Sequence, residues 1–206
     1  IEPLRLSEEI RGPHSPQFAW KGSWSASCTQ FAVGAVGESD LDLLQTTTNL
    51  RTNFSITRAY YSSFTPVRNT PFENLPPSNP WRQHRLYQAF YLLRDYHFDL
   101  EEIQFNPTGN LTLEKDPKLA WAESNLLYHP IEINTAKYEQ LLKIPGIGPV
   151  SARNIIQMRK HGKILDISTL RKLNVPTLRA SKFILLDGKR PAYQPGLFSW
   201  KPKTNP

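Results

Sequence analysis

The residues best suited to chemistry lie in the segment LLKIPGIGPVSARNIIQMRKHG, Leu141–Gly162. Apolar residues recur at helical spacing on both sides of Pro145, Gly146 and Gly148, so the pattern predicts two short helices joined by a tight turn. Gly146 can adopt the positive φ that such a reversal needs, and Gly148 lacks the Cβ that would hold a phosphate away from the backbone. Unpaired amides near Gly146, Gly148 and Val150, at the positive end of a helix dipole, predict an anion-binding site.

Polar and basic side chains around this turn would extend the anion site. Ser151 can add a hydroxyl, and the cations Lys143, Arg153 and Lys160 can reach neighbouring phosphates. None of these groups reads base edges, so the pattern predicts binding to the backbone of a nucleic acid with little sequence preference. A purely structural corner between two packed helices is the alternative, and the spacing of the glycines favours the binding site.

A second turn of the same kind follows 28 residues later. The shift pairs Leu142 with Leu170, Gly146 with Asn174, Gly148 with Pro176 and Ala152 with Ala180. Asparagine tolerates the left-handed conformation, but proline has no amide to offer a phosphate. The second turn is therefore expected to act as a packing partner of the first, although four cations flank it: Arg171, Lys172, Arg179 and Lys182.

Positive charge is concentrated in the same part of the chain. Residues 134–190 hold twelve Lys and Arg against three acidic residues, whereas the rest of the chain holds thirteen basic and fifteen acidic residues. Such a block is typical of a surface that meets a polyanion, and it predicts a steep salt dependence of nucleic-acid binding. A well-solvated helical face is the alternative explanation of the charge.

The preceding residues predict a β–α–β unit. Strand-like segments at residues 29–35 and 55–64 flank a helical segment, and this order favours parallel strands. Residues 65–80 contain five prolines and are expected to form a loop. Residues 81–96 have the apolar spacing of an amphipathic helix.

The segment IPGIGPVSA resembles the helix-hairpin-helix motif of DNA-binding and repair proteins. Pro145, Gly146, Gly148 and Ala152 stand at the usual spacing of that motif, with apolar residues between them and a predicted helix on each side. The resemblance implies that DNA is the partner and that its phosphates are the groups bound.

A longer resemblance covers about residues 26–187. The order of motifs, from QFAVGAVGESD through TRAYYSSFTPV and WRQHRLYQAFYLLRDYHF to PIEINTAKYEQLLKIPGIG, is similar to the C-terminal half of a radical SAM family of DNA modification and repair proteins. This resemblance implies a partial β/α barrel and a turn facing S-adenosylmethionine through Gly34, Gly37, Glu38 and Ser39. The residues alone are as well explained by a strand-to-helix turn that needs small side chains.

The cysteine content limits what the longer resemblance implies. Radical SAM enzymes hold a [4Fe–4S] cluster on three cysteines at CxxxCxxC spacing, whereas Cys28 is the single cysteine here. The chain alone is therefore expected to be neither an enzyme nor a cofactor-binding protein. S-adenosylmethionine and the cluster are expected only if an upstream part exists. The alternative is a remnant that persists without catalysis, and the first residue, Ile1, fits both. One cysteine also fits the cytoplasm or another reducing compartment.

Other chemistry is less well supported. The five histidines lack the spacing of metal ligands, so no metal site is predicted, and no catalytic residue is assigned. Asp166 follows Gly148 at a distance that a DNA glycosylase could use, but its setting in LDISTL favours capping of the next helix. No apolar stretch is long enough to span a membrane.

The predicted fold class is α/β, with a partial β/α barrel, followed by an all-α tandem helix-hairpin-helix module. The predicted parts are an irregular lead-in (1–27), the barrel-like region (28–100), a helical connector (101–130), the tandem module (131–190) and an extended tail (191–206). Non-sequence-specific DNA binding is the leading hypothesis. The alternative is a non-catalytic subunit of a larger complex, whose module and extended tails dock on protein.

Overall fold

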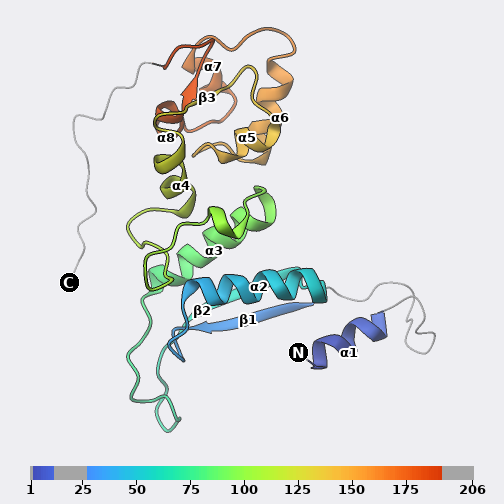
Figure 1. The fold of residues 1–206 in the computed structure, drawn as a ribbon, viewed down its shortest axis with the longest axis vertical. Coiled ribbons are helices and arrows are strands. Elements are labelled where there is room, and N and C mark those ends of the chain that lie inside the picture. The colour runs from blue at the N-terminus through green and yellow to red at the C-terminus, as the bar shows by residue number, and fades with distance from the viewer. Residues whose placement is uncertain (1, 12–26, 192–206) are drawn as a thin grey trace. The chain divides into compact units, whose positions relative to one another are not determined.

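The computed structural model describes residues 2–11 and 27–191, which belong to two compact units (Figure 1). The first unit comprises residues 1–94 and 98–117, and the second comprises residues 95–97 and 118–206. The division after residue 117 falls inside the segment predicted as a connector. No helix among the described residues combines the length and the apolar character needed to cross a membrane.

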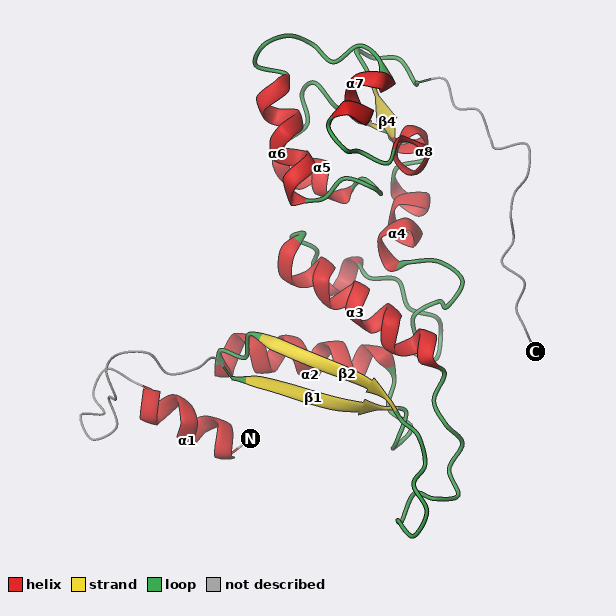
Figure 2. Ribbon diagram, turned by 180° about the vertical axis from the view of Figure 1, so that it is seen from behind, coloured by secondary structure: helices red, strands yellow, loops and turns green. Residues whose placement is uncertain are grey.

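The first unit contains a parallel pair of strands. β1 (Cys28–Val33) and β2 (Arg58–Ser63) pair from Cys28 opposite Arg58 to Val33 opposite Ser63. α2 (Asp40–Phe54) connects the strands and runs along them (Figure 2). The predicted β–α–β unit and its parallel pairing are therefore confirmed.

The free edge of β2 is covered by a helix instead of a further strand. Side chains of α3 (Pro80–Asp95) bind this edge, because Tyr61 donates its N–H to Tyr87 Oη at 3.0 Å and Ser63 donates its N–H to Gln83 Oε1 at 2.8 Å. A barrel requires each strand to pair on both sides. The described residues of this unit form a two-stranded sheet, so the predicted partial barrel is not confirmed.

The core of the first unit forms around Tyr61. Its ring stacks on Phe31 with centroids 5.8 Å apart and meets the edges of Tyr87 at 5.3 Å and Phe90 at 6.3 Å. Its hydroxyl lies 2.8 Å from Thr47 Oγ1. Burial raises the pKa of Tyr61 to about 12, because the ionised form would lose its hydration, although the hydrogen bond with Thr47 opposes the shift.

Part of the predicted irregular lead-in, residues 1–27, is helical. α1 spans Glu2–Arg11, and Arg5 pairs with Glu2 and Glu9 at the spacings that suit a helix. Pro3 lies in the first turn, where its missing N–H is tolerated. The predictions for residues 12–26 and for the tail at 192–206 lie outside the described residues.

The segment predicted as a helical connector is mostly loop. It contains the end of η1 (Leu100–Glu102) and α4 (Pro117–Asn125), and the residues between them bind the starts of α2 and α3 through their backbone. Leu111 donates its N–H to Asp40 Oδ2 at 2.9 Å, and the carbonyl of Leu113 accepts from Arg85 Nη2 at 2.7 Å. Residues 103–116 are turns and irregular chain, and α4 is the α-helix of this segment.

The second unit contains the four predicted short helices. They are α5 (Tyr138–Lys143), α6 (Pro149–Met158), α7 (Ile167–Lys172) and α8 (Thr177–Ala180), followed by η2 (Ser181–Phe183). The module is not all-α, because β3 (Ile131–Glu132) pairs in parallel with β4 (Ile184–Leu185). This pairing joins the two ends of the module over a shared core, in which Leu141, Ile147, Ile155 and Leu170 are fully buried.

Candidate nucleic-acid interface

The turn between α5 and α6 has the backbone geometry expected for a hairpin. Ile147 donates its N–H to the carbonyl of Ile144 at 3.1 Å, which closes the turn. Gly146 has a φ of 87°, in the left-handed region that glycine enters without strain. Gly148 is the N-cap of α6 and Pro149 is its first residue, where a missing N–H costs nothing.

Four backbone amides at this turn are available to a ligand. Within the described part of the chain, the N–H groups of Gly146, Gly148, Val150 and Ser151 have no internal acceptor. The amides of Val150 and Ser151 belong to the first turn of α6, where the helix dipole is positive. Val150 is 63% exposed, so solvent reaches this end of the helix. The arrangement can bind an anion.

A side chain at position 146 or 148 would crowd neighbouring atoms. A Cβ on Gly148 would lie 3.1 Å from Tyr96 Oη, so this face of the glycine is turned toward the protein and not toward a phosphate. A Cβ on Gly146 would lie 3.2 Å from the carbonyl oxygen of Pro176 and 3.5 Å from Cβ of Arg179. Packing against Tyr96 is thus one reason for a glycine at position 148, and the approach of a phosphate to this glycine stays a prediction.

The second turn packs against the first, in line with the prediction for it. Asn174 has a φ of 59°, so it adopts the left-handed conformation that Gly146 adopts in the first turn. Pro176 precedes α8 and carries no N–H. The contact between Gly146 and the backbone of Pro176 also places Arg179 beside the first turn. Pro176 cannot contribute an amide to an anion site.

The predicted cations do not all lie at the turn. Lys143 Nζ is 5.3 Å from the ring centroid of Trp121, so its charge rests on an aromatic face. Arg153 is exposed in the second turn of α6, and Ser151 is half-buried in the first. Lys160 follows the other end of α6, about 15 Å along the helix from the free amides. The structure therefore groups Ser151 and Arg153 with the turn and separates Lys160 from it.

A buried lysine supports the turn and was not predicted. Lys118 Nζ donates to the carbonyl of Ile147 at 2.6 Å and lies 4.5 Å from the ring centroid of Tyr96. Lys118, Tyr96 and Gly148 thus form one packed contact behind the amides. Nothing in the segment DPKLAW distinguishes this lysine from a solvated one at the start of a helix.

Glu132 and Asn134 connect the module ends to the link between the hairpins. Glu132 accepts from the amides of Asn134 at 2.9 Å and Gly188 at 2.8 Å, and Asn134 exchanges hydrogen bonds with the backbone of Ile164 at 2.7 and 3.0 Å. Partial burial opposes ionisation of Glu132. The hydrogen bonds from Gly188, Asn134 and Asp187 outweigh it and lower the pKa of this carboxyl.

The residues expected to face S-adenosylmethionine form a turn that is held by its own hydrogen bonds. The carboxylate of Glu38 accepts the amides of Gly34 and Val36 and lies 3.9 Å from Arg82 Nη1, and Ser39 caps α2. Gly34 has a φ of 89°, and a Cβ there would lie 2.9 Å from Ser78. Gly37 also has positive φ and faces open space. The Glu38 carboxylate thus has partners within the turn and in Arg82, and a cofactor role of these residues stays a prediction.

No cluster that could hold a metal ion occurs in the described ranges. Three or more His, Cys, Asp or Glu side chains do not come together anywhere in residues 2–11 and 27–191. Asp166 caps α7 by accepting from the amides of Ser168 at 2.9 Å and Thr169 at 3.2 Å, which is the role that its sequence setting favours. The hydrogen bond from the Ser168 hydroxyl, with those from the two amides, lowers the pKa of Asp166.

Comparison with known proteins supports the helical module. Residues 128–187 match the protein family described as "Helix-hairpin-helix motif". This motif is generally associated with DNA binding that is not sequence-specific. The match includes none of residues 28–100, on which the barrel part of the radical SAM resemblance depends. Neither the curated proteins nor the solved structures contain a match to the chain.

Proposed function

We propose that the helix-hairpin-helix module in residues 128–187 binds nucleic acid through its phosphates, with DNA as the partner and without sequence preference. The observation that carries the proposal is the group of free amides at Gly146, Gly148, Val150 and Ser151, at the start of a helix. No acidic residue occurs between Glu139 and Asp166, so nothing in this segment repels an anion. Amides at a helix start are a recurrent binding site for phosphate.

Two cations complete the proposed site. Arg153 is exposed in the second turn of α6, and the Cβ of Arg179 lies near Gly146, so its side chain starts beside the turn. Guanidinium groups bind phosphate through two parallel hydrogen bonds, so they would hold phosphates next to the one bound by the amides. Amides and arginines placed in this way contact the nucleic-acid backbone. They leave base edges unread, which is why little sequence preference is expected.

The wider setting rests on the resemblance of residues 26–187. We place the module at the C-terminal end of a radical SAM-like protein that modifies or repairs DNA, in which an upstream part supplies the three cluster cysteines and Gly34, Gly37, Glu38 and Ser39 approach S-adenosylmethionine. The iron content and the visible absorbance of the longest natural form of the protein test this setting. Absence of iron would remove it and leave the binding module.

A charge placed at the tip of α6 tests the binding site. Val150→Glu puts a carboxylate beside the free amides, at an exposed position where an acidic residue suits the helix dipole and preserves folding. We expect the affinity for duplex DNA, measured by fluorescence anisotropy at low salt, to fall about tenfold or more. Leu165→Glu is the matched control, because Leu165 is 62% exposed and lies beyond the other end of α6.

The second hairpin supplies a further comparison. Leu178 stands 28 residues after Val150, and it is 74% exposed. Because Pro176 offers no amide, Leu178→Glu should reduce the affinity less than Val150→Glu does. Equal losses at Val150, Leu165 and Leu178 would mean that only net charge matters, and the amide site would be rejected. No affinity for DNA or RNA at low salt would reject the function and favour a docking role on protein.

A further inference from the structure

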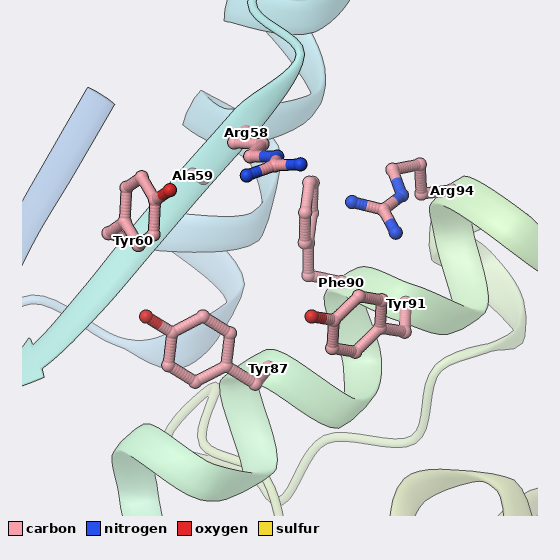
Figure 3. A pocket seen from close by; sticks show the side chains of 7 residues that line it. All are labelled: Arg58, Ala59, Tyr60, Tyr87, Phe90, Tyr91 and Arg94. Carbon is pink, nitrogen blue, oxygen red and sulfur yellow. The ribbon is translucent and has the colours of Figure 1, made fainter. Parts of the chain in front are cut away.

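The first unit contains a cleft that the hairpin does not use. The cleft has a volume of about 280 Å³ and lies between β2 and α3, and it is lined by Arg58, Ala59, Tyr60, Tyr87, Phe90, Tyr91 and Arg94 (Figure 3). The three lining residues from β2 are consecutive. The four from α3 recur at the spacing that places side chains on one face of a helix. The cleft is therefore formed by the packing of α3 against β2.

Positive charge dominates the lining of the cleft. It contains two arginines and no acidic side chain. Figure 3 shows the guanidinium groups of Arg58 and Arg94 on either side of the Phe90 ring. Arg58 is exposed, and Arg94 lies 4.8 Å from the centroid of Tyr91. Two like charges on one small cleft attract an anion, and guanidinium groups are suited to phosphate.

Flat aromatic surface is the second feature of the cleft. Tyr60 is 42% exposed and Tyr91 is 44% exposed. Burial of a tyrosine ring is favourable, so these exposed rings are suited to contact with a ligand. The hydroxyl of Tyr87 accepts the N–H of Tyr61 at 3.0 Å, so its own proton remains for a ligand atom. Free phosphate would engage the arginines and leave the rings bare. A nucleotide carries both the anion and the flat ring.

We propose that this cleft binds one nucleotide of a single-stranded nucleic acid. Its base stacks on the exposed ring of Tyr60, because the guanidinium of Arg94 already lies over the ring of Tyr91, and its phosphate binds Arg58 and Arg94. A base that stacks on a side chain must have left the duplex, which makes the ligand single-stranded. The inference is independent of the hairpin, because the hairpin contacts phosphates alone and belongs to the second unit.

Binding to a labelled single strand tests the cleft in the full chain. The probe is fluorescein-labelled oligothymidylate of about ten nucleotides, within the site sizes that single-strand binders use, and Val150→Glu serves as the background to remove hairpin binding. We expect Tyr60→Leu to weaken binding by about fivefold to a hundredfold, since stacking is lost, and Tyr60→Phe to retain it. Unchanged affinity in Tyr60→Leu would overturn the proposal.

A second pair of variants tests the phosphate contact. Arg58→Ala should weaken binding to the strand and make the slope of log K against log salt shallower by about 0.7, the value for one phosphate contact on a single strand. Arg68→Ala removes the same charge from an exposed loop position that does not line the cleft, and it should change neither quantity. Equal effects of Arg58→Ala and Arg68→Ala would show a general charge effect and overturn the proposal.

Two further measurements identify the source of the nucleotide and separate the cleft from the hairpin. Thymidine monophosphate should compete weakly with the strand, and competition at equal affinity would assign the cleft to free nucleotides and overturn the single-strand proposal. In the unmodified chain, Tyr60→Leu should leave duplex affinity unchanged, whereas Val150→Glu lowers it. A cleft variant that lowers duplex and strand affinity alike would also contradict the proposal.

Discussion

Replacing Gly148 with alanine is expected to destabilise the second unit. The new Cβ would lie 3.1 Å from Tyr96 Oη, closer than side chains normally pack. The backbone accepts alanine, because Gly148 has a φ of −107° and a ψ of −179°. The cost is therefore steric, and removing the hydroxyl should relieve it. With Tyr96→Phe, the nearest ring atom, Cζ, lies 4.0 Å from that Cβ.

The size of the effect follows from how far the neighbour must move. Tyr96 would have to retreat by about 0.3 Å to reach an ordinary contact distance, and overpacking of this kind costs about 1–3 kcal/mol. Alanine is also a poorer N-cap than glycine, which adds a cost unrelated to Tyr96. A double-mutant cycle cancels that cost. We expect a coupling free energy of about 1–2 kcal/mol in favour of the pair Gly148→Ala with Tyr96→Phe.

Urea denaturation of the four proteins measures this coupling, and hydrogen exchange in α5 and α6 assigns it to the second unit. A coupling near zero would refute the steric argument. DNA affinity of the double variant then tests the site. If Gly148 serves packing alone, the double variant binds duplex DNA like the unmodified chain. A folded double variant that no longer binds would show that a phosphate also approaches Gly148.

Two other predictions concern the stability of the module. Burial opposes the ionisation of Glu132, but hydrogen bonds led by that from Gly188 lower its pKa. The ionised carboxylate therefore stabilises the fold fully above the ordinary glutamate pKa, and this contribution is lost as the pH falls through the lowered value. Glu132→Gln loses the hydrogen bond from Gly188. Urea denaturation should show a free energy of unfolding that is lower by about 1 kcal/mol at neutral pH, with a smaller difference in acid. A difference that does not change with pH would contradict this. Asn174→Ala should cost about 1 kcal/mol by thermal unfolding because its φ is 59°, whereas Asn174→Gly should cost nothing, and equal losses would show that a side-chain contact matters instead.

The geometry of the turns was predictable because it depends on the residues that form them. Gly146 and Asn174 both adopt positive φ, as glycine and asparagine can with least strain. Pro149 opens α6, and Asp166 caps α7, since proline and aspartate suit these positions in any helix. The parallel pairing of β1 and β2 was predictable for a similar reason, because a helix between two strands rarely permits another arrangement.

The contacts that hold the turns were not predictable because their partners are distant in the sequence. Lys118 reaches Ile147 across 29 residues, and Asn134 reaches Ile164 across 30. No periodicity or motif connects such pairs, and Asn134 has the residue type of a helix cap while its side chain binds elsewhere. The contact of α3 with the edge of β2 was not predictable for a related reason, since neither strand pattern nor resemblance indicates it, and the partial barrel is not confirmed.

The count of positive charges overstates the surface that can meet DNA. Arg159 donates to the carbonyls of Ile133 and Ala136 at 2.9 and 2.8 Å, Lys163 pairs with Asp187 at 2.7 Å, and Arg190 donates to the carbonyl of Leu127 at 2.6 Å. Arg159 and Arg190 thus bind backbone carbonyls of their own unit, and Lys163 is paired with a neighbouring carboxylate.

The proposed phosphate site uses neutral amides in place of such cations. An amide binds a phosphate without releasing the counterion that a lysine or arginine releases, so it adds affinity but little salt dependence. The slope of log K against log salt on duplex DNA should therefore be roughly −2 to −4, which corresponds to the few exposed cations near the turn and not to the whole basic block. A slope near −8 would mean that binding spreads over the block and that the turn has no special part in it.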